Sequence, residues 1–187
     1  GDTIYFEADG GSTGDELWAH DTSNSSTWLV ADINSGGNSD PGYRMQILVG
    51  DTIYFDANDG SNGAQEDVWA HDTSNSSTWK VSTIGTGTST LSGSTPGTNM
   101  AILVGDIIYF DADDWPGSNR HELWAHNTSN GTTWQVYDIN SAGNSDPGKQ
   151  MAILVGDAIY FDASGSAGSE LWAFGSGNGA SGPSAGP

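Results

Sequence analysis

Internal repetition narrows the range of folds open to this chain. Four segments recur with a period of about 50 residues. They are Ile-Tyr-Phe, ending at Phe6, Phe55, Phe110 and Phe161; Leu-Trp or Val-Trp, ending at Trp18, Trp69, Trp124 and Trp172; Thr-Trp, ending at Trp28, Trp79 and Trp134; and Ile-Leu-Val, ending at Val49, Val104 and Val155. Such a period is typical of arrays in which each repeat is one small unit packed on its neighbours.

Each recurring segment predicts a β-strand, because it is rich in β-branched and aromatic residues and is bounded by Gly, Asn, Asp and Ser. Gly-Asp joins Ile-Leu-Val to Ile-Tyr-Phe as a two-residue hairpin turn. The longest connection runs from Thr-Trp to the next Ile-Leu-Val, so it lies between units. We therefore predict an all-β fold, a β-propeller-like array of four-stranded antiparallel blades.

The repeats are expected to form one domain over residues 1–174, with units that begin near residues 1, 50, 105 and 156. The first unit lacks its Ile-Leu-Val strand and the fourth its Thr-Trp strand, which leaves unpaired strand edges at both ends. Exposed edges recruit partners. We expect self-association, by strand exchange or closure through a second copy, or continuation into a longer array. The Gly-, Ser- and Pro-rich residues 175–187 predict a flexible tail.

Charge and composition exclude several functions. Acidic residues outnumber basic residues by 24 to 4, which gives a net charge of −20. Such a surface repels nucleic-acid phosphates and anionic lipids, so neither is an expected partner. The absence of cysteine excludes disulfides and thiolate chemistry. No apolar run approaches the length of a membrane span.

The second recurring segment carries a family resemblance. Glu16–Trp18, preceded by Gly-Asp-Thr-Ile-Tyr-Phe and followed by Asp32–Asn34, resembles the secreted repeats named for their Glu-Leu-Trp-x-x-Asp-Gly-Thr signature. The match departs at Thr22, where the signature has glycine, at Asp67–Trp69, and at Ala173–Gly175. The resemblance implies an extracellular or cell-surface, propeller-like protein, and it implies no shared activity.

Acidic loops follow two of the Ile-Tyr-Phe segments. They place Asp56 and Asn58, and Asp111 and Asp113, at alternate positions near glycine. Calcium takes six to eight hard oxygen ligands from flexible segments, so these four residues are candidate calcium ligands. Asp, Asn and Gly also build ordinary turns, in which they bond their own backbone. Both interpretations stay open, and calcium is the one cofactor that the sequence favours.

Histidines occupy one position of three repeats, at His20, His71 and His126. Three imidazoles are in principle a zinc ligand set. The fourth repeat has Phe174 at this position, which indicates packing beside the repeat tryptophan. We therefore predict that the histidines pack and bind no transition metal.

The tryptophans that end Leu-Trp recur too regularly to be separate ligand anchors, and we assign them to the packing between blades. Trp115 is different, because it occurs in one repeat only, beside Pro116 and Gly117. We predict that Trp115 is exposed and take it as the candidate ligand-binding aromatic residue.

Four asparagines, Asn24, Asn75, Asn127 and Asn130, stand in Asn-x-Ser/Thr sequons. Three of the four sequons fall in the same repeat hairpin, so attached sugars would decorate one side of the array. Asparagine and serine also make good turns.

The sequence contains no recognisable catalytic constellation: no serine stands in a Gly-x-Ser-x-Gly elbow, and no carboxylate pair is distinguished from the rest. We therefore predict a non-enzymatic, extracellular structural or assembly module. The alternative is a carbohydrate-binding, lectin-like propeller, either dependent on calcium or independent of it.

Overall fold

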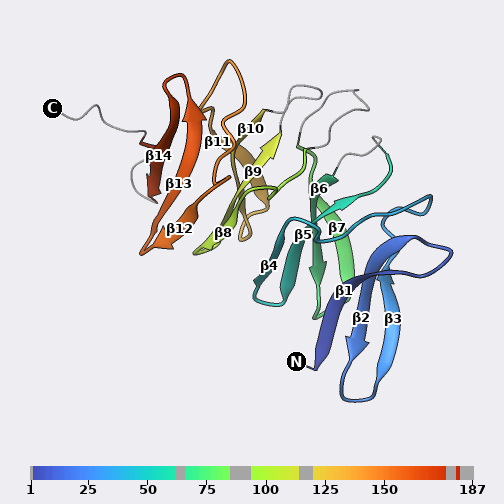
Figure 1. The fold of residues 1–187 in the computed structure, drawn as a ribbon. Helices are drawn as coiled ribbons and strands as arrows, with labels where there is room; N and C mark the ends of the chain where they lie inside the picture. The colour runs from blue at the N-terminus through green and yellow to red at the C-terminus, as the bar shows by residue number, and fades with distance from the viewer. Residues whose placement is uncertain (1, 62–65, 85–93, 114–119, 176–179, 182–187) are drawn as a thin grey trace.

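The computed structural model describes residues 2–61, 66–84, 94–113, 120–175 and 180–181, and these residues form four antiparallel sheets (Figure 1). Blade 1 contains β1 (Thr3–Asp9), β2 (Asp15–Asp21) and β3 (Ser26–Ala31); blade 2 contains β4 (Gln46–Val49), β5 (Thr52–Asn58), β6 (Glu66–Asp72) and β7 (Ser77–Ser82). Blade 3 contains β8 (Ala101–Val104), β9 (Ile107–Asp113), β10 (His121–Asn127) and β11 (Thr132–Tyr137); blade 4 contains β12 (Ala152–Val155), β13 (Ala158–Gly165), β14 (Gly168–Gly175) and β15 (Ala180–Ser181).

The predicted fold class and strand pairing are confirmed. Each blade is a meander in which Ile-Tyr-Phe pairs with the Trp-containing strand that follows it, and the Ile-Leu-Val strand, where present, pairs on the other side. Blade 4 differs from the expected pattern, because Ala180–Ser181 of the predicted tail pairs with β14 at the place of a Thr-Trp strand. The described residues contain no helix of the length and hydropathy that a membrane crossing requires.

Alternation gives every blade two different faces. In blade 2, Ile53 is opposite His71 and Phe55 is opposite Trp69, and these four side chains form what we name the Trp face. Tyr54, opposite Ala70, belongs to the other side, which we name the Tyr face and which also carries Val68. The registers are repeated in the other blades, so each blade has a Trp face and a Tyr face.

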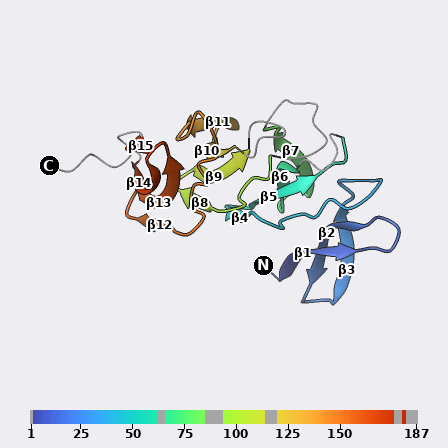
Figure 2. The ribbon, with the colours of Figure 1, turned by 45° about the horizontal axis from the view of Figure 1, so that its top comes forward.

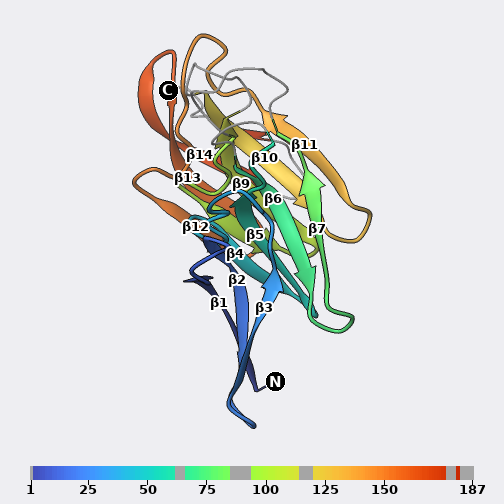
Figure 3. The same ribbon diagram turned by 90° about the vertical axis from the view of Figure 1, so that its right-hand side faces the viewer.

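The blades pack face to face, Tyr face of one on Trp face of the next. The core between blades 2 and 3 joins Tyr54 and Val68 to Ile108 and Phe110. Two more clusters of the same kind lie between blades 1 and 2 and between blades 3 and 4. The four sheets follow one another along an open array with blade 1 and blade 4 at opposite ends (Figures 1 and 2), and Figure 3 views the stack from the side of blade 1.

A Pro-Gly turn links the second and third connections to the blade before them. Gly97 and Gly148 have positive φ angles of 77°, and a Cβ on either would lie 2.7–2.8 Å from the side chain of Met45 or Met100 in the preceding blade. Glycine is therefore required there by both conformation and space. Met45 and Met100 are buried, whereas Met151 of blade 4 has no following turn among the described residues and is exposed.

Candidate functional site

The acidic residue before Leu-Trp anchors the connection between blades. Its carboxylate accepts one backbone N–H from the start of the connection and one serine hydroxyl from its far end. The sets are Glu16 with Ile33 and Ser39, Asp67 with Ile84 and Ser94, and Glu122 with Ile139 and Ser145. Burial raises the pKa of Glu16 and Asp67, and raises the pKa of Glu122 to about 7. Glu170, at the same position of blade 4, is exposed.

The acidic residue after Ile-Tyr-Phe anchors the Ile-Leu-Val strand of its own blade. Its carboxylate accepts the backbone N–H groups of the methionine and of the residue before it, at 2.8–3.0 Å. The sets are Asp56 with Arg44 and Met45, Asp111 with Asn99 and Met100, and Asp162 with Gln150 and Met151. Glu7 holds this position in blade 1, and no backbone N–H of the described residues donates to its carboxylate.

The four predicted calcium ligands therefore have other partners in this structure. Asp56 and Asp111 are buried among backbone donors. Asn58 accepts the N–H of Gly60 in an ordinary turn, and Asp113 is buried at the end of β9. None of the four belongs to a group of three metal-binding side chains within the part of the chain described above. Calcium binding at these residues stays a prediction.

The repeat histidines pack between blades. The ring pairs are Tyr5 with His71 at 5.2 Å, Tyr54 with His126 at 5.4 Å and Tyr109 with Phe174 at 5.0 Å. His71 and His126 are buried, and each Nδ1 lies 2.9 Å from a threonine hydroxyl on the neighbouring strand. The predicted packing is observed for His71 and His126, each against a tyrosine of the preceding blade, and the absence of metal binding stays a prediction. His20 and Tyr160 are the two members of this series without a partner ring in the described residues.

The ends of the array expose the two halves of the interface that the blades use between themselves. Blade 4 has an uncovered Tyr face, on which Tyr160 is 37% exposed and Leu171 is 57% exposed. The corresponding residues of blade 3, Tyr109 and Leu123, are 4% and 0% exposed. Blade 1 has an uncovered Trp face with Ile4 exposed.

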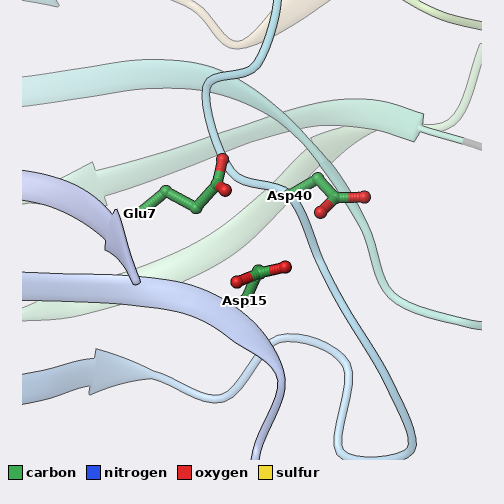
Figure 4. A group of neighbouring side chains, drawn as sticks. All are labelled: Glu7, Asp15 and Asp40. Atoms are coloured by element: carbon green, nitrogen blue, oxygen red, sulfur yellow. The ribbon is translucent and has the colours of Figure 1, made fainter. Parts of the chain in front are cut away.

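Three carboxylates gather at the loop end of blade 1 (Figure 4). Glu7 of β1, Asp15 of β2 and Asp40 of the connection to blade 2 each have one oxygen within 4.8 Å of the others, and they are the only such group in the described ranges. Burial raises the pKa of Glu7, and repulsion from Asp15 and Asp40 raises it further. The site is acidic and is partly open to solvent.

Blade 2 shows how the same position is neutralised. Asp56 and Glu66 correspond to Glu7 and Asp15, and the guanidinium of Arg44 forms ion pairs with both. Arg44 directly precedes Met45, the methionine ahead of the Ile-Leu-Val strand of blade 2.

A groove of about 920 Å³ lies between β1 of blade 1 and β4 of blade 2. Its wall includes Tyr5, Glu7 and Leu17 from blade 1, and Ile47, Leu48 and Phe55 from blade 2. In the next interface, between blades 2 and 3, the space beside β8 is filled by β4. Ile47 and Val49 of β4 pack there against the same core as Leu103 of β8. Leu48 occupies in β4 the position of Leu103, yet it is 64% exposed.

The exposed tryptophans of the described residues lie on the Thr-Trp strands, and the exposure of Trp115 stays a prediction. Trp115 lies outside the described residues. Trp28, Trp79 and Trp134 of the Thr-Trp strands are 37–41% exposed in three successive blades. The sequence analysis did not predict this exposure. The Thr-Trp strand is the last strand of each predicted blade and pairs on one side only, and this position could have indicated that its tryptophan is exposed.

The sequon asparagines build the hairpin turns. Asn24, Asn75 and Asn130 each accept the backbone N–H of the residue two positions later, and Asn127 does the same for Ser129. Asn24, Asn75 and Asn130 are exposed, so sugar attachment at these residues stays a prediction that exposure permits.

Comparisons with known proteins support the fold. No family model and no curated protein match the chain, so the resemblance to the secreted repeats stays a prediction. Among solved structures, TolB from Acinetobacter baumannii matches over 97% of this chain with a TM-score of 0.53 and 14% identity. A putative TolB from Agrobacterium tumefaciens matches over 97% with a TM-score of 0.50 and 10% identity. An oligogalacturonate lyase in complex with manganese matches over 88% with a TM-score of 0.50 and 16% identity.

This chain spans only 40%, 61% and 40% of those three proteins. At such identities the likeness defines a class of fold, the β-propeller type, and carries no activity to this chain.

Proposed function

We propose that this chain is a non-enzymatic structural module, outside the cell or on its surface, that assembles end to end. The observation that carries the proposal is the pair of uncovered faces at the two ends. The Trp face of blade 1 and the Tyr face of blade 4 are the complementary halves of a contact that is made three times within the chain. A second copy that docks one face on the other would extend the same series of cores.

The contact is heterologous, which means that it forms closed rings or open filaments according to the rotation between copies. The net charge of −20 opposes association, so it should strengthen as salt screens the repulsion.

A complementation experiment tests the proposal. Leu171→Glu disables the Tyr face of blade 4 and Ile4→Glu disables the Trp face of blade 1. Each variant alone should be monomeric in light scattering at a concentration and salt where the wild type associates. An equimolar mixture should give a discrete 1:1 dimer, since one intact face of each kind remains.

Ser35→Glu is the matched control, because Ser35 is an exposed residue of the connection between blades 1 and 2, and it should associate like the wild type. A wild type that stays monomeric at all concentrations and salts would overturn the proposal, as would variants that associate normally.

Carbohydrate binding is the second candidate function, and the exposed Trp28, Trp79 and Trp134 favour it. Aromatic faces stack on sugar rings, and one such face per blade suits a repeating polysaccharide. A glycan array of the wild type and of a Trp79→Ala variant, each with and without calcium, tests this function. Binding that Trp79→Ala leaves intact would contradict the role of these tryptophans.

A further inference from the structure

The edge of β1 that faces away from β2 has no partner strand among the described residues, since β1 pairs with β2 alone. The other three Ile-Tyr-Phe strands each pair on this side with an Ile-Leu-Val strand in one register. The matched partners are Gln46 with Phe55, Ala101 with Phe110, and Ala152 with Phe161. An unpaired edge with a fixed register elsewhere in the fold is a template for strand addition.

The groove beside this edge is lined by apolar residues of both blades, which suits an added strand. It lies between β1 and β4, at the position that β4 fills in the next interface, between blades 2 and 3. Leu48 faces it uncovered, whereas its counterpart Leu103 packs in the core that also takes Ile47 and Val49. A strand in the groove with apolar residues at alternate positions would cover Leu48 in the same way.

The carboxylates at the end of the groove match the rest of such a ligand. Glu7 stands where Asp56 accepts the two backbone N–H groups that precede the Ile-Leu-Val strand. Glu7 and Asp15 correspond to Asp56 and Glu66, the two carboxylates that pair with Arg44 in blade 2, and Asp40 adds a third carboxylate beside them. The edge, the groove and the acidic group can therefore bind one continuous peptide segment: the acidic group binds its first residues, and the edge and the groove bind the apolar strand that follows.

We propose that blade 1 is a binding site for an extended peptide strand in which an arginine or lysine is followed by methionine and then by alternating apolar residues. The strand adds antiparallel to β1, with the residue after the methionine opposite Phe6 and the last of the following residues opposite Thr3, as Gln46 and Val49 lie opposite Phe55 and Thr52. The side chain of its cationic residue lies against Asp15 and Asp40, and the backbone N–H groups of that residue and of the methionine point to Glu7. The site is separate from the end faces and does not depend on the proposed function.

A synthetic peptide with the sequence of residues 41–49, Pro-Gly-Tyr-Arg-Met-Gln-Ile-Leu-Val, is the probe. The protein used is the Leu171→Glu variant, so that end-to-end association does not contribute. Fluorescence anisotropy of labelled peptide should show saturable 1:1 binding. Hydrogen exchange should show new protection of β1 amides, with none on β3, β7 or β11.

Two changes separate the parts of the site. Leu48→Glu, at an exposed position, should weaken binding by at least about tenfold, whereas Leu154→Glu at the matching position of blade 4 should not. Replacing the peptide arginine by glutamine should weaken binding several-fold to the parent protein but not to an Asp15→Asn/Asp40→Asn variant, because the lost charge pair is then already absent.

The inference is overturned if the peptide does not bind at millimolar concentration, if Leu48→Glu and Leu154→Glu bind it equally, or if protection appears on β3, β7 or β11. Association in the complementation experiment with no peptide binding would leave the proposed function standing and remove this site. Peptide binding by a protein that never associates would support this site and overturn the proposed function.

Discussion

Blades 3 and 4 carry the same tyrosine and leucine on their Tyr faces, but these residues are buried in blade 3 and exposed in blade 4. Tyr109 and Leu123 are enclosed by blade 4, while Tyr160 and Leu171, at the same positions of the next repeat, face solvent. The strand register at these positions is the same in the two blades, with Tyr109 opposite Ala125 and Tyr160 opposite Ala173. The repeat sequence therefore specifies half of an interface, and the stabilisation comes only when a neighbour supplies the other half.

The largest expected effect tests this comparison directly. Leu123→Ala should lower the free energy of unfolding by about 2–5 kcal/mol, because it removes buried apolar atoms and leaves a cavity. Leu171→Ala should change it by less than about 0.5 kcal/mol, since the side chain is exposed. Urea denaturation at low protein concentration measures both. Equal losses would mean that blade 4 is covered in solution.

The acidic anchors give the next effect. Glu16→Ala leaves the N–H of Ile33 without its carboxylate acceptor and the hydroxyl of Ser39 with only the carbonyl of Asp15, at a cost of about 1–3 kcal/mol. Glu170→Ala, at the same repeat position, should be close to neutral because Glu170 is exposed. The same denaturation experiment compares them, and a neutral Glu16→Ala would contradict the anchoring role.

The pH dependence separates the buried and exposed members of this series. Burial raises the pKa of folded Glu122 to about 7, so the folded protein holds a proton that the unfolded chain releases above its ordinary carboxyl pKa. The contribution of Glu122 to stability is therefore full at acid pH and is lost as the pH rises toward 7.

Melting temperatures between pH 5 and pH 8 provide the measurement. Glu122→Gln should make the decline with pH shallower, while Glu170→Gln should leave the slope of the wild type, which also contains the general charge repulsion. Parallel slopes for all three proteins would show that Glu122 is ionised throughout.

The smallest effect should not distinguish the blades at all. Ser25 and Ser76 adopt positive φ angles of 60° and 61° in their hairpins, where blade 3 has Gly131 at 72°. Glycine relieves this strain, so Ser25→Gly and Ser76→Gly should each stabilise by roughly 0.5–1 kcal/mol. Gly131→Ser should lose a similar amount. Thermal denaturation that gave a gain in one blade only would point to a local difference between the hairpins.

The strand order and hairpins were predictable from the sequence because they depend on contacts between neighbouring segments. Ile-Tyr-Phe pairs with the Trp strand that follows it, and the Gly-Asp turn fixes the other hairpin. The anchors were not predictable. In the sequence, Asp56 resembles part of a local acidic loop. In the structure its carboxylate accepts the backbone N–H groups of residues 44 and 45, which only the packed connection brings near. The exposed Trp79 was missed for the same reason, since exposure depends on which strands have a second neighbour.

The sequence by itself determined the repeat, the all-β class and the four-stranded blade, because alternation and turn residues act over a few positions and recur in every copy. Only the tertiary structure decided which copies of a residue are buried. Leu123 and Leu171 are indistinguishable in their motifs, and Glu7 differs from Asp56 by one methylene group. Their environments differ because burial depends on the surface of another blade, and at the two ends of this array that surface is not supplied by the described residues.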